Sequence, residues 1–169
     1  MRGRIRILGI DPGSQVTGYG ILDAGVNDNV LVQWGAIRTV GEHAARLRQI
    51  FTQVAQLVSE FQPSEIAIER VFVHRNADSA LKLGQARAAA LCATFDAELP
   101  VFEYSARHIK KAVVGRGGAD KGQVQHMVRL LLAMREEPQA DAADALAAAL
   151  CRSHERNANA LLREVATPS

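Results

Sequence analysis

Short runs of apolar residues, several of them β-branched, are separated by turns rich in Gly, Asp and Asn in the first part of the chain. Runs of this length and composition are typical of β-strands. A later run, Ile66-Ala67-Ile68-Glu69, has the same character and is expected to be a buried strand in a parallel pairing. The predicted strands are residues 4–10, 17–22, 30–38, 66–69 and 99–104.

Longer segments repeat their apolar residues at the three- and four-residue spacing of one helix face. Ile50, Val54 and Val58 show this spacing between residues 42 and 61, and Pro63 ends the run. Residues 155–169 carry little core-forming pattern and are expected to form a flexible C-terminal tail. The predicted helices are residues 42–61, 76–95, 105–114, 121–134 and 140 to about 154.

The order of these elements predicts an α/β fold in which helices flank a five-stranded mixed sheet. Three successive strands joined by short turns favour an antiparallel beginning, and a helical crossover favours a parallel continuation. With 169 residues and 48% hydrophobic content, the chain can bury one sizeable core. We therefore expect a single domain over residues 1–154, followed by the tail.

Charge and composition exclude few classes of binding partner or cellular location. The formal net charge is +2, so nucleic-acid binding would have to rest on local clusters of Lys and Arg. Cys92 and Cys151 lack the spacing of a zinc site or a disulfide framework, and each is expected in the core of a reduced protein. Because no apolar stretch reaches the length of a membrane span, we expect a cytoplasmic protein with no membrane partner.

Two carboxylates come at the ends of predicted strands. Asp11 directly follows the apolar run that ends at Ile10, and Glu69 ends the strand that contains Ile68. Burying an acid at such a position is expensive unless a cation, a metal ion or a metal-bound phosphate pairs with it. The two positions therefore indicate a functional site at one edge of the sheet.

A second pair of acids, Asp141 and Asp144, lies three residues apart on one face of a predicted helix. Acids in a first helical turn commonly cap free amides, which alone would explain either residue. The alanines around them, however, make a helix that can approach a sheet closely and bring both acids toward the strand ends. Four carboxylates gathered there repel one another unless divalent cations neutralise them, and oxygen ligands select Mg²⁺ or Mn²⁺.

Four ordered motifs resemble the RuvC family of bacterial Holliday junction resolvases. They are Gly-Ile-Asp-Pro-Gly-Ser with Thr-Gly-Tyr-Gly from residue 9, Ile-Glu-Arg-Val-Phe from residue 68, Asn-Ala-Asp-Ser-Ala-Leu-Lys-Leu-Gly-Gln-Ala-Arg from residue 76, and Gln-Ala-Asp-Ala-Ala-Asp-Ala-Leu-Ala from residue 139. The resemblance covers residues 7 to about 154. It implies a ribonuclease-H-like fold and a homodimer that nicks two strands symmetrically across four-way junction DNA in homologous recombination and DNA repair. It also implies RuvA and RuvB, the branch-migration proteins, as partners.

By motif position, the resemblance assigns Asp11, Glu69, Asp141 and Asp144 as catalytic metal ligands. It implies Mg²⁺-dependent hydrolysis with two ions per subunit, roughly 3.5–4 Å apart, and Mn²⁺ able to substitute. The products would be 5′-phosphate and 3′-hydroxyl ends. Asp11 is the expected bridging ligand, and Lys121 is expected to stabilise charge that develops on the phosphate.

The resemblance also indicates DNA contacts beyond the carboxylates. Lys110 occupies a position where the family carries a lysine near the scissile phosphate, and Phe72 is expected to stack on an unpaired base rather than to fill the core. Where family members often carry Gln and Ala-Lys, this chain has Arg70 and His74-Arg75. The predicted DNA-binding residues are Phe72, Arg70, Arg75, Lys110, Arg116 and Lys121.

A junction has approximate two-fold symmetry, so two coordinated nicks require two identical sites. The predicted helix 76–95 is the expected dimer element, because its small residues allow helices to approach closely while its larger apolar residues supply anchors. The small residues are Gly84, Ala88 and Ala89, and the anchors are Leu81, Leu91 and Phe95. The alternative is that this face packs on the sheet of its own domain.

Two other functions share parts of the pattern. Actin-like ATPases and sugar kinases also begin with a strand that ends in Asp-x-Gly, but they repeat the fold in two lobes, for which 169 residues leave no room. A non-catalytic junction-binding module is the third possibility, and the complete set of four carboxylates counts against it. Cleavage of a labelled four-way junction would separate the three functions.

Overall fold

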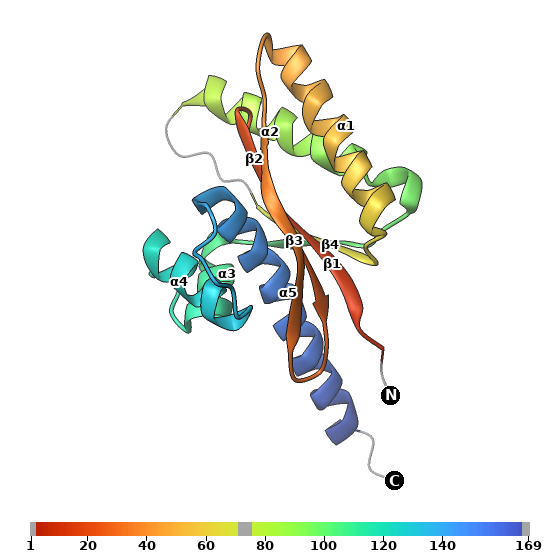
Figure 1. Cartoon of the computed structure of the whole chain (residues 1–169), viewed down its shortest axis with the longest axis vertical. Helices are drawn as coiled ribbons and strands as arrows, with labels where there is room; N and C mark the ends of the chain where they lie inside the picture. Colours follow the sequence, from red (N-terminus) through yellow and green to blue (C-terminus); the bar gives the residue numbers. More distant parts are fainter. Residues whose placement is uncertain (1–2, 71–75, 167–169) are drawn as a thin grey trace.

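A computed structural model describes residues 3–70 and 76–166 of the protein, and these residues contain a five-stranded mixed sheet (Figure 1). The strand order is β3-β2-β1-β4-β5; the β3–β2 and β2–β1 pairs are antiparallel, and the β1–β4 and β4–β5 pairs are parallel. The predicted α/β class and mixed sheet are therefore confirmed. The strands are β1 (Ile5–Asp11), β2 (Val16–Ala24), β3 (Asn29–Arg38), β4 (Glu65–Glu69) and β5 (Val101–Tyr104).

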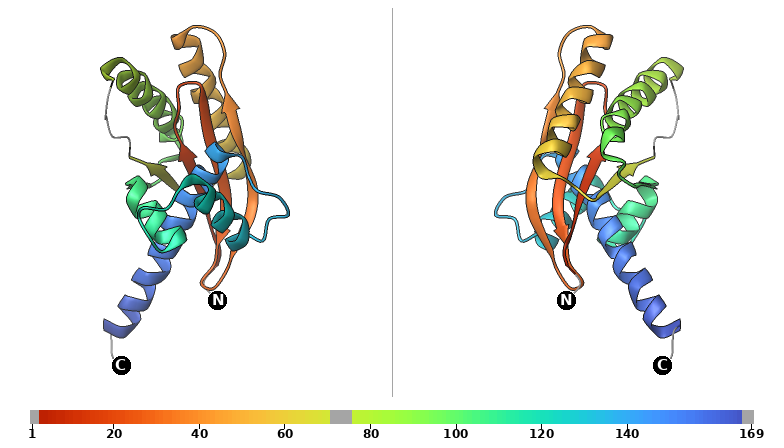
Figure 2. Two further views of the ribbon diagram at one scale, coloured as in Figure 1. Left: turned by 90° about the vertical axis from the view of Figure 1, so that its left-hand side faces the viewer. Right: turned by 90° about the vertical axis from the view of Figure 1, so that its right-hand side faces the viewer.

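Helices cover both faces of this sheet (Figure 2). One face carries α1 and α2, which pack against each other, and the other carries α5 with α3 and α4 beside it. A single 3₁₀ turn, Phe95–Ala97, follows α2 where the sequence predicted a continuing helix. The helices are α1 (His43–Phe61), α2 (Ala77–Cys92), α3 (Ala106–Val114), α4 (Lys121–Leu131) and α5 (Ala140–Ala166).

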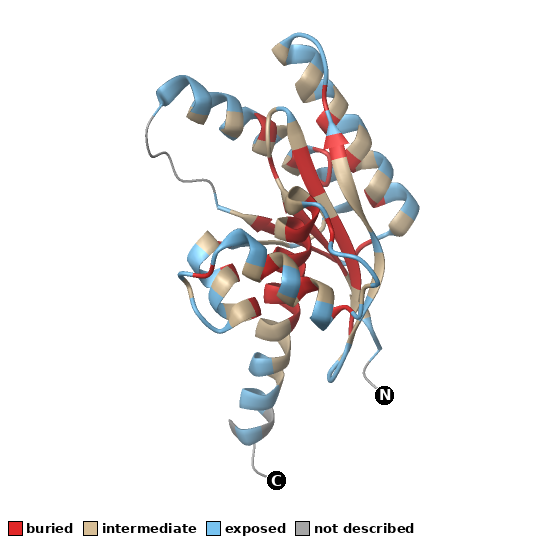
Figure 3. Cartoon of the chain, turned by 60° about the vertical axis from the view of Figure 1, so that its left-hand side comes forward, coloured by how far each residue is buried: buried red, intermediate tan, exposed pale blue. Residues whose placement is uncertain are grey.

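The core consists of two apolar layers separated by the sheet, and Figure 3 shows the buried residues concentrated on the strands and on the first half of α5. Ile50 and Val54 of α1 are fully buried against the face that contains Leu8 and Ile10. On the opposite face, the alanine-rich beginning of α5 is fully buried. Burial on both faces explains why β1 and β4 read as continuous apolar runs rather than as alternating ones.

The last helix is longer than the sequence predicted. We expected it to end near His154 and to be followed by an irregular tail, whereas α5 continues to Ala166. Polar contacts explain part of the extension, because the Asn157 amide donates to the carbonyl oxygens of Gly25 at 3.0 Å and Val26 at 3.1 Å. Apolar periodicity cannot reveal an anchor of this kind.

The prediction for the cysteines was half right. Cys151 is buried within α5, but Cys92 is exposed at the end of α2. Its position on the outward side of α2 explains the difference, since the side of this helix that faces α1 is occupied by Ala86 and Ala90. In the part of the chain that the structure describes, no helix combines the length and apolar character needed to cross a membrane.

Candidate active site

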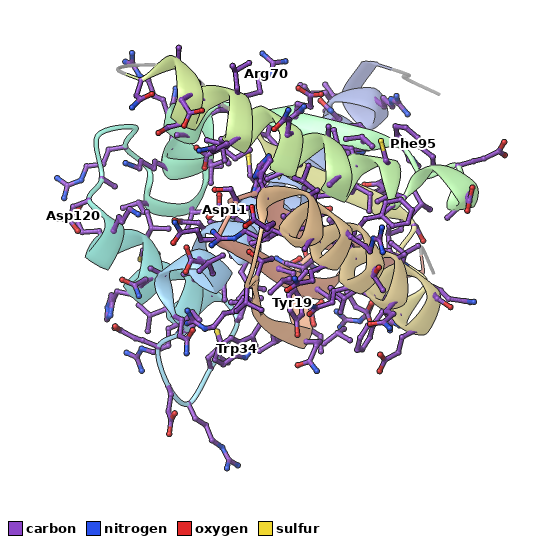
Figure 4. All side chains as sticks on the ribbon, turned by 90° about the horizontal axis from the view of Figure 1, so that it is seen from above. Asp11, Tyr19, Trp34, Arg70, Phe95 and Asp120 are labelled. Atoms are coloured by element: carbon purple, nitrogen blue, oxygen red, sulfur yellow. The ribbon has the colours of Figure 1, made fainter. Side chains whose placement is uncertain are left out.

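Asp11 and Glu69 end adjacent parallel strands. Ile10 of β1 is in register with Ile68 of β4, so the next residues along the two strands, Asp11 and Glu69, come side by side at the same edge of the sheet. Both side chains are partly buried. The predicted placement of these two acids at one sheet edge is therefore confirmed, and Figure 4 shows Asp11 near the middle of the molecule when viewed from above.

Helix α5 brings the second pair of acids to this edge because glycines on the sheet let its backbone come close. A Cβ atom on Gly18 would collide with the main-chain oxygen of Asp141, and one on Gly9 would collide with that of Ala145. Asp141 and Asp144 both lie in the first turns of α5, three residues apart. The two-residue spacing of the glycines along β2, visible in Thr-Gly-Tyr-Gly, is the sequence signal of this close approach.

The four carboxylates act on one another electrostatically. Burial, together with repulsion from Asp144, Glu69 and Asp141, raises the pKa of Asp11 to about 8. Burial likewise raises the pKa of Glu69 and of Asp144, again with repulsion from a neighbouring acid. Raised carboxylate pKa values of this kind are typical of functional sites, where a fold holds like charges close together at a cost in stability.

Two lysines oppose this accumulation of negative charge. Lys121 favours the ionised form, and so acts to lower the pKa, of Asp11, Glu69 and Asp144, while Lys110 acts in the same direction on the last two. Lys121 is the first residue of α4. The structure thus brings both predicted lysines within electrostatic range of the carboxylates.

The turn after Asp11 is held by two buried threonine hydroxyls. The Thr17 hydroxyl donates to the carbonyl oxygen of Gly13 at 2.8 Å and accepts a hydrogen bond from the Gly13 N–H at 3.2 Å. The Thr39 hydroxyl donates to the carbonyl oxygen of Ser14 at 2.9 Å. These bonds restrict the backbone that follows Asp11, and no sequence pattern marks either threonine for this role.

A long-range contact links the start of α5 to the sheet. The Arg38 guanidinium, at the end of β3, donates to the Gln139 side-chain oxygen at 2.9 Å, immediately before the helix that carries Asp141. One hundred and one residues separate the two partners along the chain. No local pattern could have indicated this bond.

The donor set fits a hard divalent cation. All four side chains are carboxylates, and burial together with repulsion between them raises the pKa values of three, an effect that such a cation would offset. Within residues 3–70 and 76–166, no three His, Cys, Asp or Glu side chains already converge closely enough to hold a metal ion.

The structure describes two of the four remaining predicted DNA-binding residues, Arg70 and Arg116. Arg70, which directly follows β4, places its guanidinium 3.7 Å from the Glu103 carboxylate, and more than half of its side chain is exposed. Figure 4 shows Arg70 toward the periphery, away from Asp11. Arg116 is exposed in the glycine-rich connection between α3 and α4. Phe72 and Arg75 lie outside the described residues.

Comparisons with known proteins agree with the resemblance. The profile of the family described as "Crossover junction endodeoxyribonuclease RuvC" matches residues 7–152. A protein of that name from Aeromonas hydrophila subsp. hydrophila is 57% identical over 151 residues, which are 89% of this chain and 87% of the relative. Another, from Methylococcus capsulatus, is 57% identical over 152 residues, which are 89% of this chain and 92% of the relative.

Solved structures show the same similarity. Thermus thermophilus RuvC matches with a TM-score of 0.83 and 32% identity, covering 92% of this chain and 97% of that one. The same organism's RuvC in complex with a Holliday junction substrate matches with a TM-score of 0.86 and 32% identity, covering 92% and 96%. These matches confirm the predicted ribonuclease-H-like architecture. The chain therefore belongs to the RuvC family of crossover junction endodeoxyribonucleases.

Proposed function

We propose that this protein is a metal-dependent endodeoxyribonuclease that resolves Holliday junctions by nicking two strands symmetrically, in homologous recombination and DNA repair. The observation that carries the proposal is the gathering of four mutually repelling carboxylates on β1, β4 and α5 of a RuvC-family chain. The similarity to a RuvC structure that contains Holliday junction DNA supports the substrate.

Asp11, Glu69, Asp141 and Asp144 would hold Mg²⁺, two ions per subunit, with Mn²⁺ as a substitute. When bound, such ions activate a water molecule for in-line attack and stabilise the leaving 3′ oxygen, so that the products carry 5′-phosphate and 3′-hydroxyl ends. Asp11 lies between Glu69 on its own sheet and the acids of α5, which makes it our choice for a ligand shared by both ions.

Lysine side chains complete the site in this proposal. Lys121 would face the scissile phosphate and stabilise the charge that develops there, and Lys110 would hold the same strand. Both act on the carboxylates electrostatically, which supports their placement near a phosphate bound at the same ions. Further along the DNA, we assign backbone contacts to Arg70, Arg75 and Arg116 and base stacking to Phe72.

We also propose that the protein acts as a homodimer through α2. Leu81 and Phe95 are 67% and 61% exposed, and a Cβ atom on Gly84 would meet nothing within 4 Å. Leu81, Gly84 and the exposed Ala88 share one face of α2 at helical spacing, and Phe95 follows in the 3₁₀ turn beyond the helix. Leu81→Asp should give a monomer in analytical ultracentrifugation, whereas Leu130→Asp, at an exposed leucine of α4, should leave the dimer intact; a monomeric wild-type chain with junction DNA bound would exclude the dimer.

The cellular part of the proposal follows from the substrate. A junction-resolving enzyme must act where chromosomal DNA is recombined, which in bacteria is the cytoplasm. RuvA and RuvB, which migrate the branch point, are the partners expected beside it. Co-purification of the full chain with RuvA and RuvB on a four-way junction, but not on linear duplex, is the result that supports this partnership.

Cleavage of a labelled four-way junction tests the main proposal. With Mg²⁺, the wild-type protein should make paired nicks that a ligase can seal, and with EDTA it should bind the junction without cutting it. A linear duplex of the same sequence should remain intact. Equal cutting of duplex and junction, or cutting in EDTA, would contradict the proposal.

A further inference from the structure

A polar cleft of about 330 Å³ lies next to the turn that follows Asp11, on the side of the sheet that carries α1 and α2. Its walls come from three separate parts of the chain: the β1–β2 turn, the connection from β3 into α1, and the middle of α2. The residues that matter here are Ser14, Gln15, Glu42, His43, Arg46 and Lys82.

Hydrogen bonds hold the walls of this cleft in place. The Arg46 guanidinium donates through Nε to the carbonyl oxygen of Gly41 at 2.7 Å, which fixes the side chain against the β3–α1 connection. His43 Nε2 lies 2.6 Å from the side-chain oxygen of Gln85 and so joins α1 to α2. A binding site built from such fixed groups loses little conformational entropy when a ligand arrives.

Positive charge predominates in the cleft. Arg46 and Lys82 are cationic and His43 adds polar donor capacity, whereas Glu42 is the only acid among the lining residues. The pair of Lys82 with Asp78 spans 2.7 Å, but both side chains are largely exposed, and surface pairs of this kind contribute little. Lys82 can therefore exchange that partner for another anion.

The start of α1 adds a second source of positive potential. Glu42 makes no side-chain capping bond, and the first turn of α1 contains no acidic residue. The amide groups of a helix N-terminus and the helix dipole both favour an anion. In this protein Glu42 and His43, at the start of α1, line a cleft that also contains a guanidinium and an ammonium group.

We propose that this cleft binds a backbone phosphate of the DNA substrate, as a contact separate from the carboxylate site. A phosphate matches the paired donors of Arg46 and the point charge of Lys82. The shared β1–β2 turn places this contact beside the strand end at Asp11, on the face opposite α5. The inference rests on the proposed function, since it takes DNA as the substrate and adds a point at which it is held.

The test measures binding of the full-length protein to a fluorescent four-way junction by anisotropy, at several salt concentrations and without divalent cations. Arg46→Gln and Lys82→Gln should each weaken binding roughly tenfold and lower the slope of log affinity against log salt by about 1. Glu42→Gln removes a negative charge and should tighten binding. Arg48→Gln is the matched control, because Arg48 is exposed on α1 but does not line the cleft.

The outcomes separate this inference from the proposed function. If either Arg46→Gln or Lys82→Gln keeps the affinity and salt slope of Arg48→Gln, the cleft does not bind phosphate, even when the wild-type protein binds and cuts junctions normally. A Glu42→Gln variant that fails to bind more tightly would contradict it as well. Failure of the wild-type protein to cut a junction in Mg²⁺ would instead contradict the proposed function.

Discussion

Gly18 is the cross-strand partner of Asp11, and the same residue is the point at which the main chain of Asp141 touches the sheet. Gly18 therefore takes part both in the pairing of β1 with β2 and in the packing of α5 on the sheet. Because a side chain there would collide with the Asp141 carbonyl, the distance between the β1 acid and the α5 acids depends on the absence of a single Cβ atom.

Gly18→Ala should move α5 away from the sheet. We expect a loss of roughly 1–3 kcal/mol in the free energy of unfolding, as in other overpacked cores, and at least a tenfold loss of junction cleavage. Gly3→Ala is a suitable control, since a Cβ atom there meets nothing within 4 Å. Normal cleavage by Gly18→Ala would show that the acids do not depend on this close contact.

Thr17 offers a matched pair of variants. Thr17→Val keeps the shape of the side chain but leaves the Gly13 N–H and C=O without their partner, which should cost about 1–3 kcal/mol and reduce cleavage several-fold. Thr17→Ser retains the hydroxyl and should cleave close to the wild-type rate. Urea denaturation and single-turnover kinetics measure the two effects, and equal rates for Val and Ser would rule out a role for the hydroxyl.

The raised pKa of Asp11 predicts how the stability of the metal-free protein depends on pH. The folded state keeps a proton on Asp11 up to about pH 8, whereas the unfolded chain releases it near pH 4. Stability should therefore fall as the pH rises through this window, because the folded state binds more protons than the unfolded one. In denaturation experiments, the stability difference between Asp11→Asn and wild type should grow with pH and shrink when Mg²⁺ is added; a constant difference would contradict the shift.

A buried ion pair at the other end of β4 should affect stability without affecting chemistry. Arg152 Nε lies 2.8 Å from the Glu65 carboxylate, with only 10% and 9% of the two side chains exposed. Arg152→Met removes one of two guanidinium groups on the buried Glu65 carboxylate, because Arg156 also pairs with it, and should cost roughly 1–3 kcal/mol. The double variant with Glu65→Met should recover much of the loss. Cleavage at 25 °C should persist, since Glu65 begins the strand that Glu69 ends; a selective loss of cleavage in a folded variant would contradict this separation.

The local apolar pattern was sufficient to predict where the two acid-bearing strands, β1 and β4, end. Asp11 and Glu69 each follow an apolar run, so their position at strand ends could be predicted without knowledge of the sheet order. The turn threonines could not be found in this way, because a hydroxyl reveals its partner only in three dimensions. The bond between Arg38 and Gln139 joins distant parts of the chain and leaves no periodic signal.

The extension of α5 was missed for a related reason. Its second half is anchored by Asn157 to the β2–β3 turn rather than by a continuous apolar stripe, and hydrophobic periodicity does not report polar anchors. The exposed position of Cys92 also depends on which side of α2 meets α1, which composition alone cannot decide.

The central claim is that Asp11 holds the metal ions that cut the junction. Asp11→Asn preserves the size of the side chain but removes the charge that a divalent cation requires. The most direct measurement is single-turnover cleavage of a four-way junction in Mg²⁺, with junction binding measured on the same preparation. We predict that Asp11→Asn loses cleavage by at least about 1000-fold, the scale of removing a principal catalytic group, while binding the junction as tightly as wild type. A variant that nicks at the wild-type rate would contradict the account.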